Sequence, residues 1–106
     1  MSRFRHTQNL STIKFDKTIT MYCPLGKEHY TAKVIVEICP NEWLMDYLDV
    51  ERFFKETQGS TFIIEDLVEK VYNYLYEQCE PTYLSVTVEA SNAAHFPVTI
   101  MKETEI

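Results

Sequence analysis

The sequence has 106 residues, a hydrophobic content of 45% and a formal net charge of −6. A chain of this length forms one domain with a small core, and association with other copies often stabilises such domains. The negative charge argues against a nucleic acid partner, which requires clustered lysine and arginine. We therefore expect the partner to be a small molecule or another copy of the chain, as a homo-oligomer.

The cysteines indicate an intracellular setting. There are three, Cys23, Cys39 and Cys79, without a Cys-x-x-Cys pair, and this pattern is typical of reduced thiols. No run approaches the roughly 18 consecutive apolar residues of a membrane span, and the N-terminus lacks the apolar core of a signal peptide. We expect a cytoplasmic protein with no membrane contact. It would have a flexible arm over residues 1–10, a single domain over 11–102 and a tail over 103–106.

Two segments near the N-terminus alternate between apolar and polar residues. The alternation covers residues 12–22 and 30–38 and has the period of two that half-buried strands show. The loop between them is short, so an antiparallel hairpin is the natural interpretation. Pro40 follows the second segment and ends it, because proline cannot donate to a strand ladder.

Two helices are predicted next, over residues 46–56 and 62–78. The first has apolar residues at Leu48, Val50, Phe53 and Phe54. The second has one apolar stripe with helical spacing, formed by Ile64, Leu67, Val68, Val71 and Leu75. Ser60 or Thr61 is expected to cap the second helix.

The last two strands are predicted over residues 83–90 and 96–101, with Pro97 at an edge or a bulge. The order β-β-α-α-β-β predicts an α+β fold in which one four-stranded antiparallel sheet carries both helices on one face. Such a sheet has two open edges, which invite pairing with other copies. Closure of several sheets into an oligomeric barrel would remove these edges and create pockets between subunits.

The loop over residues 23–30 concentrates the reactive side chains. It holds Cys23, Gly26, Glu28 and His29 within seven residues, and Gly26 is one of only two glycines in the chain. Gly26 is expected to supply a positive φ in the turn. Any enzymatic interpretation has to involve Cys23.

These elements and residues resemble the tunnelling fold, a superfamily of pterin and 7-deazapurine enzymes. Residues 22–26, Tyr-Cys-Pro-Leu-Gly, resemble the Cys-Pro-x-Thr-Gly turn of the nitrile reductases that act on 7-cyano-7-deazaguanine. Residues 40–44, 62–66 and 81–88 resemble further segments of that family. The resemblance implies that Cys23 adds to the nitrile to form a thioimide. It also implies that Glu65 holds the N–H edge of the ring.

The sequence departs from that family in two places. The Glu-Ser-Lys-Ser motif, which the family uses for NADPH, is Met-Asp-Tyr-Leu-Asp at residues 45–49, so NADPH is only weakly supported as a cofactor. The family's proton-donating loop aspartate is replaced, and Glu28 or His29 falls near its position. Related amidinotransferases keep the cysteine and lack the cofactor motif, so a non-reducing cysteine enzyme is an alternative.

A second family, the 6-pyruvoyl- and 6-carboxytetrahydropterin synthases, is similar at other segments. Residues 45–50 resemble its Met-Asp-Phe-x-Asp-Leu motif, which includes Asp46, and residues 86–89 resemble a strand that carries a substrate-binding glutamate, here Glu89. The zinc of these lyases needs three histidines, and Lys27 replaces one of them. We therefore expect no zinc and no other metal site. A third family, dihydroneopterin aldolase, shares mainly the fold and a Glu65-type anchor.

Each candidate residue also has a structural interpretation. Cys23 would be a small buried apolar residue, and His29 a surface histidine rather than a proton shuttle. Glu65 and Asp46 would complement helix N-termini, and Glu89 would lie on the polar side of a strand. If these interpretations hold, the protein is a catalytically degenerate tunnelling-fold protein that binds a ring or only assembles. If not, we expect Cys23 and Glu65 to share one crevice once several copies join.

Overall fold

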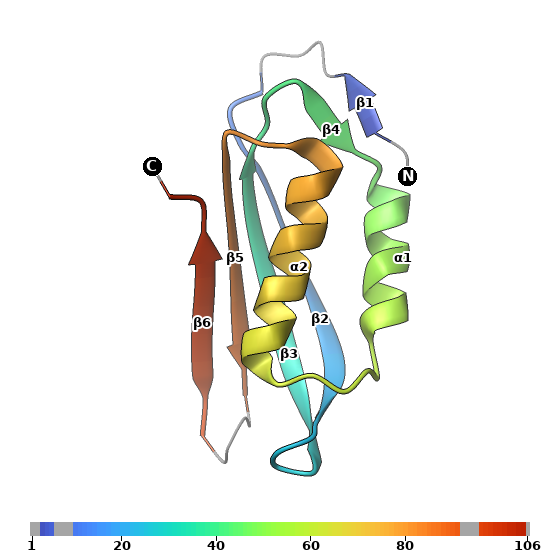
Figure 1. The fold of residues 1–106 in the computed structure, drawn as a ribbon, viewed down its shortest axis with the longest axis vertical. Coiled ribbons are helices and arrows are strands. Elements are labelled where there is room, and N and C mark those ends of the chain that lie inside the picture. Colours follow the sequence, from blue (N-terminus) through green and yellow to red (C-terminus); the bar gives the residue numbers. More distant parts are fainter. Residues whose placement is uncertain (1–2, 6–9, 92–95, 106) are drawn as a thin grey trace.

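The computed structural model describes residues 3–5, 10–91 and 96–105. Its elements in chain order are β1 (Arg3–Arg5), β2 (Ile13–Cys23), β3 (Glu28–Cys39), β4 (Trp43–Met45), α1 (Tyr47–Thr57), α2 (Ile64–Cys79), β5 (Tyr83–Ala90) and β6 (Val98–Glu103). A four-stranded antiparallel sheet of order β2-β3-β5-β6 carries both helices on one face (Figure 1). The predicted α+β class and layer arrangement are confirmed. No helix in the described part of the chain is long and apolar enough to cross a membrane.

The core lies between the sheet and the helices. Alternate residues of β3 point toward the helices and are buried, namely Tyr30, Ala32, Val34, Val36 and Ile38. The stripe of α2 covers them with the apolar residues that the sequence predicts, including Leu67, Val71 and Leu75. In α1 the buried apolar residues are Val50 and Phe54. Leu48, another apolar residue of this helix, is 70% exposed and lies outside the core.

The two helices begin differently. Asp46 is the N-cap of α1, and its carboxylate accepts a hydrogen bond from the Leu48 N–H at 2.9 Å. The α2 helix begins at Ile64 after the extended residue Ile63, which makes no side-chain cap. The expectation that Ser60 or Thr61 caps this helix is therefore wrong, and the Ser60 hydroxyl instead donates to the Glu56 carbonyl.

A second, two-stranded sheet lies beside the start of α1. Strand β1 pairs antiparallel with β4, and Arg5 forms an ion pair with Glu42. Strand β1 falls within the expected flexible arm, and no strand was predicted at residues 43–45, because three-residue strands are too short to show an alternating pattern. The last strand also extends further than expected, and the Thr104 N–H donates to the Leu84 carbonyl at 2.9 Å.

Candidate active site at the Cys23 turn

Cys23 is the last residue of β2 and the first of a tight turn to β3. Its carbonyl accepts the Lys27 N–H at 2.8 Å, and its Sγ accepts the Gly26 N–H at 3.4 Å. The turn's positive φ, 54°, occurs at Lys27 and not at Gly26, so the role expected for this glycine is wrong. Hairpin turns of this length often include one left-handed residue, and here Lys27 takes that position.

Strand alternation decides which neighbours of Cys23 share its side of the sheet. Cys23 pairs with Glu28 across the hairpin, and Tyr22 pairs with His29. The Sγ of Cys23 and Oε1 of Glu28 both lie within 4.0 Å of the position that a Cβ on Gly26 would occupy. The His29 ring packs edge-on against Tyr22 at 5.2 Å, on the opposite face. Within one chain, Glu28 and not His29 accompanies the thiol.

Backbone hydrogen bonds bring the start of α2 to the same end of the sheet. Residues 59–62 run beside the end of β2, where the Gly59 N–H donates to the Thr20 carbonyl at 2.9 Å. The Tyr22 N–H donates to Ser60 and the Phe62 N–H donates back to Tyr22, each at 3.1 Å. Because Cys23 follows Tyr22 directly, this pairing places the first turn of α2 next to the cysteine turn.

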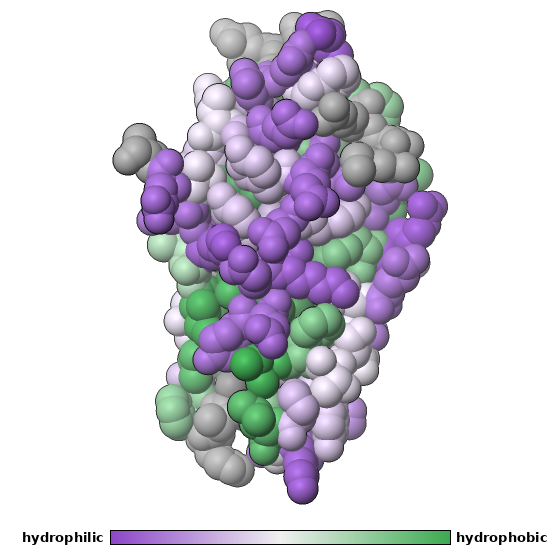
Figure 2. Space-filling model, viewed as in Figure 1, coloured by the Kyte–Doolittle hydropathy of each residue, from purple (hydrophilic) through white to green (hydrophobic). Residues whose placement is uncertain are grey.

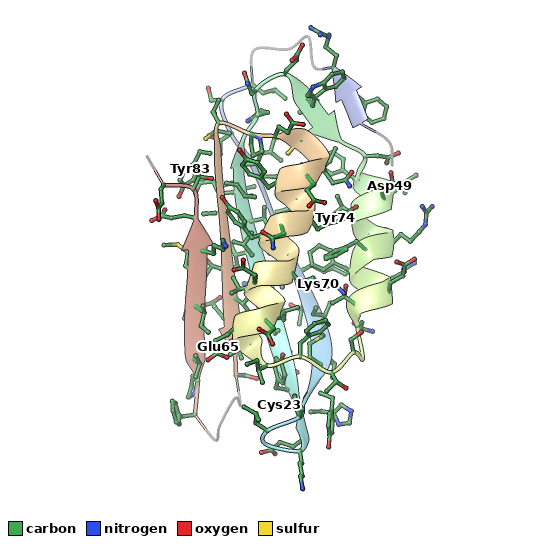
Figure 3. The ribbon with its side chains drawn as sticks, in the orientation of Figure 1. Cys23, Asp49, Glu65, Lys70, Tyr74 and Tyr83 are labelled. Carbon is green, nitrogen blue, oxygen red and sulfur yellow. The ribbon has the colours of Figure 1, made fainter. Side chains whose placement is uncertain are left out.

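Tyr30 links the two parts of the site. Its hydroxyl donates to the Phe62 carbonyl at 2.6 Å, which joins β3 to the segment that precedes α2. Burial raises the pKa of Tyr30 to about 12, and the negative charges of Cys23 and Glu65 contribute to the shift. Both groups therefore lie within electrostatic range of one buried hydroxyl. Figure 3 shows Cys23 and Glu65 at the same end of the molecule.

The surroundings of these groups are partly apolar. Figure 2 shows hydrophobic atoms at the surface near the start of α2 and the β2–β3 turn. Leu25, in the turn, is 80% exposed, while Cys23 is partly buried and Glu65 is exposed. A thiol, an exposed carboxylate and adjacent apolar surface can hold a planar ring with N–H donors and present an electrophilic carbon to sulfur.

Comparison with known proteins identifies the architecture. No protein-family model matches the chain, and no curated protein does. A solved structure does match, the archaeosine synthase QueF-like in its apo form, with 20% sequence identity and a TM-score of 0.82. The match covers 92% of this chain and 96% of that chain. The chain has the tunnelling fold.

Two other residues predicted for a tunnelling-fold site lie elsewhere in the chain. Asp46 caps α1, which begins at the end of the molecule opposite the Cys23 turn (Figure 1). Glu89 is exposed on the sheet face without helices, where it pairs with Lys33 and Thr99 on the neighbouring strands. Glu89 and Lys33 help to line a surface hollow of about 290 Å³. Cys23 and Glu65 thus lie at the same end of a single chain, Asp46 and Glu89 lie elsewhere, and His29 lies beside Cys23 on the opposite face of the sheet.

The cofactors of related tunnelling-fold enzymes differ in how well they fit this chain. The charged side chains of residues 45–49 are two carboxylates, and Asp46 caps a helix while Asp49 pairs with Arg52 at 3.2 Å. Phosphate groups are bound by basic side chains and free N–H groups, so this segment does not fit NADPH. Within residues 3–5, 10–91 and 96–105, no three metal-ligating side chains form a group that could hold an ion. His6 and His95 lie outside these ranges.

Sequence reasoning missed Tyr30 as a site residue. Its position in the alternating pattern of β3 marks it as a buried apolar residue, and that assignment is correct for its ring. The signal for a further role was its polar hydroxyl at the end of the reactive loop, because buried tyrosine hydroxyls usually bond to a partner. Glu28 was considered only as an alternative to His29.

Proposed function

We propose that this protein is a cysteine-dependent enzyme of 7-deazapurine metabolism in which Cys23 is the nucleophile and Glu65 holds the ring. The observation that carries the proposal is the pairing of residues 59–62 with the end of β2, which sets the first turn of α2, with Glu65, at the same end of the chain as Cys23. The likeness to an archaeosine synthase of the same fold supports this substrate class over others. The acting form would be a homo-oligomer that binds a small ring and no nucleic acid.

The proposed first step is an addition to a nitrile. The Cys23 thiol adds across the carbon–nitrogen triple bond of 7-cyano-7-deazaguanine, so that sulfur bonds to carbon and the nitrogen gains a proton. Glu28, on the same side of the turn as Sγ, is placed to pass that proton. The product is a thioimide, and its formation requires no oxidant or reductant.

The second step differs between the nitrile reductases and the related amidinotransferases. A reductase would deliver hydride from NADPH, for which residues 45–49 are unsuited. We propose instead that a nitrogen nucleophile attacks the thioimide carbon and displaces the Cys23 thiolate. An amidine is formed and the thiol is regenerated. The neighbouring structure is named as a synthase, which agrees with a non-reducing reaction.

Intact-mass spectrometry tests the proposal. After incubation with 7-cyano-7-deazaguanine and a phosphine reductant, we expect one adduct per chain. Cys23→Ser should abolish the adduct, while Cys39→Ser, a matched control at another partly buried thiol, should retain it. Glu65→Gln should slow adduct formation at least about tenfold, because it removes a charge-assisted hydrogen-bonded pair.

Three results would contradict the proposal in different ways. Saturable ring binding without an adduct would remove Cys23 as the nucleophile and leave a binding protein. Absence of any ring binding would reject the substrate class. Stoichiometric zinc in elemental analysis, together with turnover of a pterin substrate, would establish the lyase alternative.

A further inference from the structure

The two outer strands of the sheet, β2 and β6, can be joined between copies of the chain. Within the described residues each has one strand neighbour in the order β2-β3-β5-β6, and Figure 1 shows them on opposite sides of the sheet. Every neighbouring pair in this sheet is antiparallel, so β2 and β6 run in opposite directions. Strand β6 of a second copy can therefore extend the sheet at β2 and keep it antiparallel.

On β2, the even-numbered residues direct their backbone groups toward the edge. Residues 59–62 lie along this edge and bond there to the backbone groups of Thr20 and Tyr22. Backbone groups of alternate residues in a strand point the same way, so three more residues of β2 offer theirs at the edge. These residues are Lys14, Asp16 and Thr18. The chain's own segment thus covers the edge from Thr20 onward, and an added strand can pair only before that point.

On β6, the odd-numbered residues direct their backbone groups toward the edge. The Thr104 N–H donates to the Leu84 carbonyl of β5, so the even-numbered residues of this strand face β5. Pro97 precedes the strand with the parity of the edge residues, but proline has no N–H to donate. The residues of β6 that remain for pairing at the edge are Thr99, Met101 and Glu103.

One register of β2 against β6 of a second copy matches the two strands at both ends. It sets Thr20 opposite Pro97. The Thr20 carbonyl already accepts the Gly59 N–H at 2.9 Å, and Pro97 has no N–H to offer, so both strands stop pairing at the same row. The same register sets Lys14 opposite Glu103. Residues opposite each other in a sheet share a face, so these two charges attract across the boundary.

Other registers fit less well. A shift of two residues in one direction sets Asp16 opposite Glu103, which places like charges side by side. A shift in the other direction sets Thr18 opposite Pro97 and leaves the free Thr18 carbonyl without a donor. Two β2 strands paired about a two-fold axis over the same three residues would oppose their Asp16 carboxylates. Charge and backbone donors therefore favour the head-to-tail register.

We propose that β2 of each copy pairs with β6 of the next in this register, and that Phe96 of the next copy thereby reaches the Cys23 end of the first. Beyond the row of Thr20 and Pro97, the chain of the next copy meets residues 59–62, which lead into α2. Phe96 is 60% exposed in the single chain. Its ring then covers the ring bound at Cys23. This second part rests on the proposed function, whereas the strand pairing does not.

Zero-length carbodiimide coupling followed by peptide mass spectrometry tests the register. We expect a peptide that links the Lys14 ammonium to the Glu103 carboxylate. Within one chain the two strands lie three strand spacings apart, about 14 Å, so this link reports two copies. The link from Lys14 to Glu37, its opposite neighbour on β3, is the internal control. Assembled protein that gives the control link without the Lys14–Glu103 link would overturn the pairing, and so would a wild type that stays monomeric.

Charge reversal tests the same contact by sedimentation velocity. Lys14→Glu and Glu103→Lys should each weaken association about threefold to tenfold, because an opposite-charge pair becomes a like-charge pair. The double variant should recover most of the wild-type association. Lys33→Glu is the matched control, since it also opposes two glutamates within a chain, at Glu89, but lies on an inner strand. It should leave association unchanged. Failure of the double variant to recover would contradict the register.

Phe96→Ala tests the contribution of the next copy to the site. In a Cys23→Ser background, where binding is reversible, it should weaken binding of 7-cyano-7-deazaguanine about threefold or more and leave the assembled mass unchanged. Leu48→Ala, at another exposed apolar residue, is the control and should change neither quantity. Equal binding with and without Phe96 would overturn this contribution. If the background protein binds no ring at all, the proposed function fails, and the coupling experiment still decides the strand pairing.

Discussion

At the scale of single residues, the turn after Cys23 sets the geometry of the candidate site. The Gly26 N–H points at Sγ, and Lys27 takes the one left-handed conformation of the turn. A sequence indicates that such a turn exists, but not which residue has the positive φ, because that depends on how the two strands pair. Gly26 was the reasonable prediction from composition alone, and the strand register moves the strained position to Lys27.

Two substitutions check this turn. Gly26→Ala should leave stability unchanged or raise it by about 0.4–1 kcal/mol, since the added Cβ would lie 3.8 Å from Sγ, an ordinary contact. Lys27→Gly should stabilise the protein by about 1 kcal/mol by relieving the left-handed backbone. Urea unfolding measures both changes. A loss of more than about 1 kcal/mol in Gly26→Ala, with no gain in Lys27→Gly, would show that Gly26 holds the positive φ.

At the scale of elements, hydrophobic periodicity in the sequence predicts the long strands and helices. It does not predict the backbone contacts that bring the parts of the candidate site together. The alternation in β2, β3 and β5 and the stripe on α2 gave these elements within a few residues. The pairing of residues 59–62 with the end of β2 uses backbone groups, which every residue carries, so no side-chain pattern marks it. The position of Cys23 and Glu65 at the same end of the molecule depends on that pairing.

Tyr30→Phe tests the link between β3 and this segment. The substitution leaves the Phe62 carbonyl without its donor and should destabilise the protein by about 1–2 kcal/mol. Hydrogen exchange of the Phe62 amide, which donates to Tyr22, should become faster. Tyr76→Phe, on the exposed side of α2, is the control and should change neither quantity. Equal behaviour of the two variants would contradict the role given to Tyr30.

The raised pKa of Tyr30 predicts a dependence of stability on pH. The folded state holds this proton more tightly than the unfolded chain, so its contribution is complete below the ordinary pKa of 10.0 and is lost as pH rises to about 12. The wild type should lose more stability over this range than Tyr30→Phe, as urea midpoints at successive pH values would show. If both proteins lose the same stability over this pH range, groups other than the Tyr30 hydroxyl cause the loss.

Substitutions of Asp46 distinguish a role as the N-cap of α1 from a role in binding the substrate. Asp46→Ala should destabilise the protein by about 1 kcal/mol through loss of the cap on Leu48, and Asp46→Asn should retain most of that stability. Both variants should form the Cys23 adduct at the wild-type rate. If Asp46→Asn remains stable but forms the adduct much more slowly, the residue contacts the substrate, as in the pterin synthase resemblance.

At the scale of the whole molecule, the sheet ends in two edge strands, β2 and β6, and no helix of residues 3–5, 10–91 or 96–105 covers its second face. The two open edges are the feature from which a barrel of several copies is predicted, and the tunnelling fold is consistent with that proposal. The candidate site is different, because Cys23 and Glu65 lie at the same end of one chain and both charges contribute to the raised pKa of Tyr30. Association would then enclose the ring rather than unite the reactive groups.

A crystal structure of the assembled protein with 7-cyano-7-deazaguanine tests this central claim most directly. We predict continuous density from Cys23 Sγ to the former nitrile carbon, with the N–H edge of the ring on the Glu65 carboxylate of the same chain. A ring held between Cys23 of one chain and Glu65 of another, or bound away from an unmodified Cys23, would contradict the account.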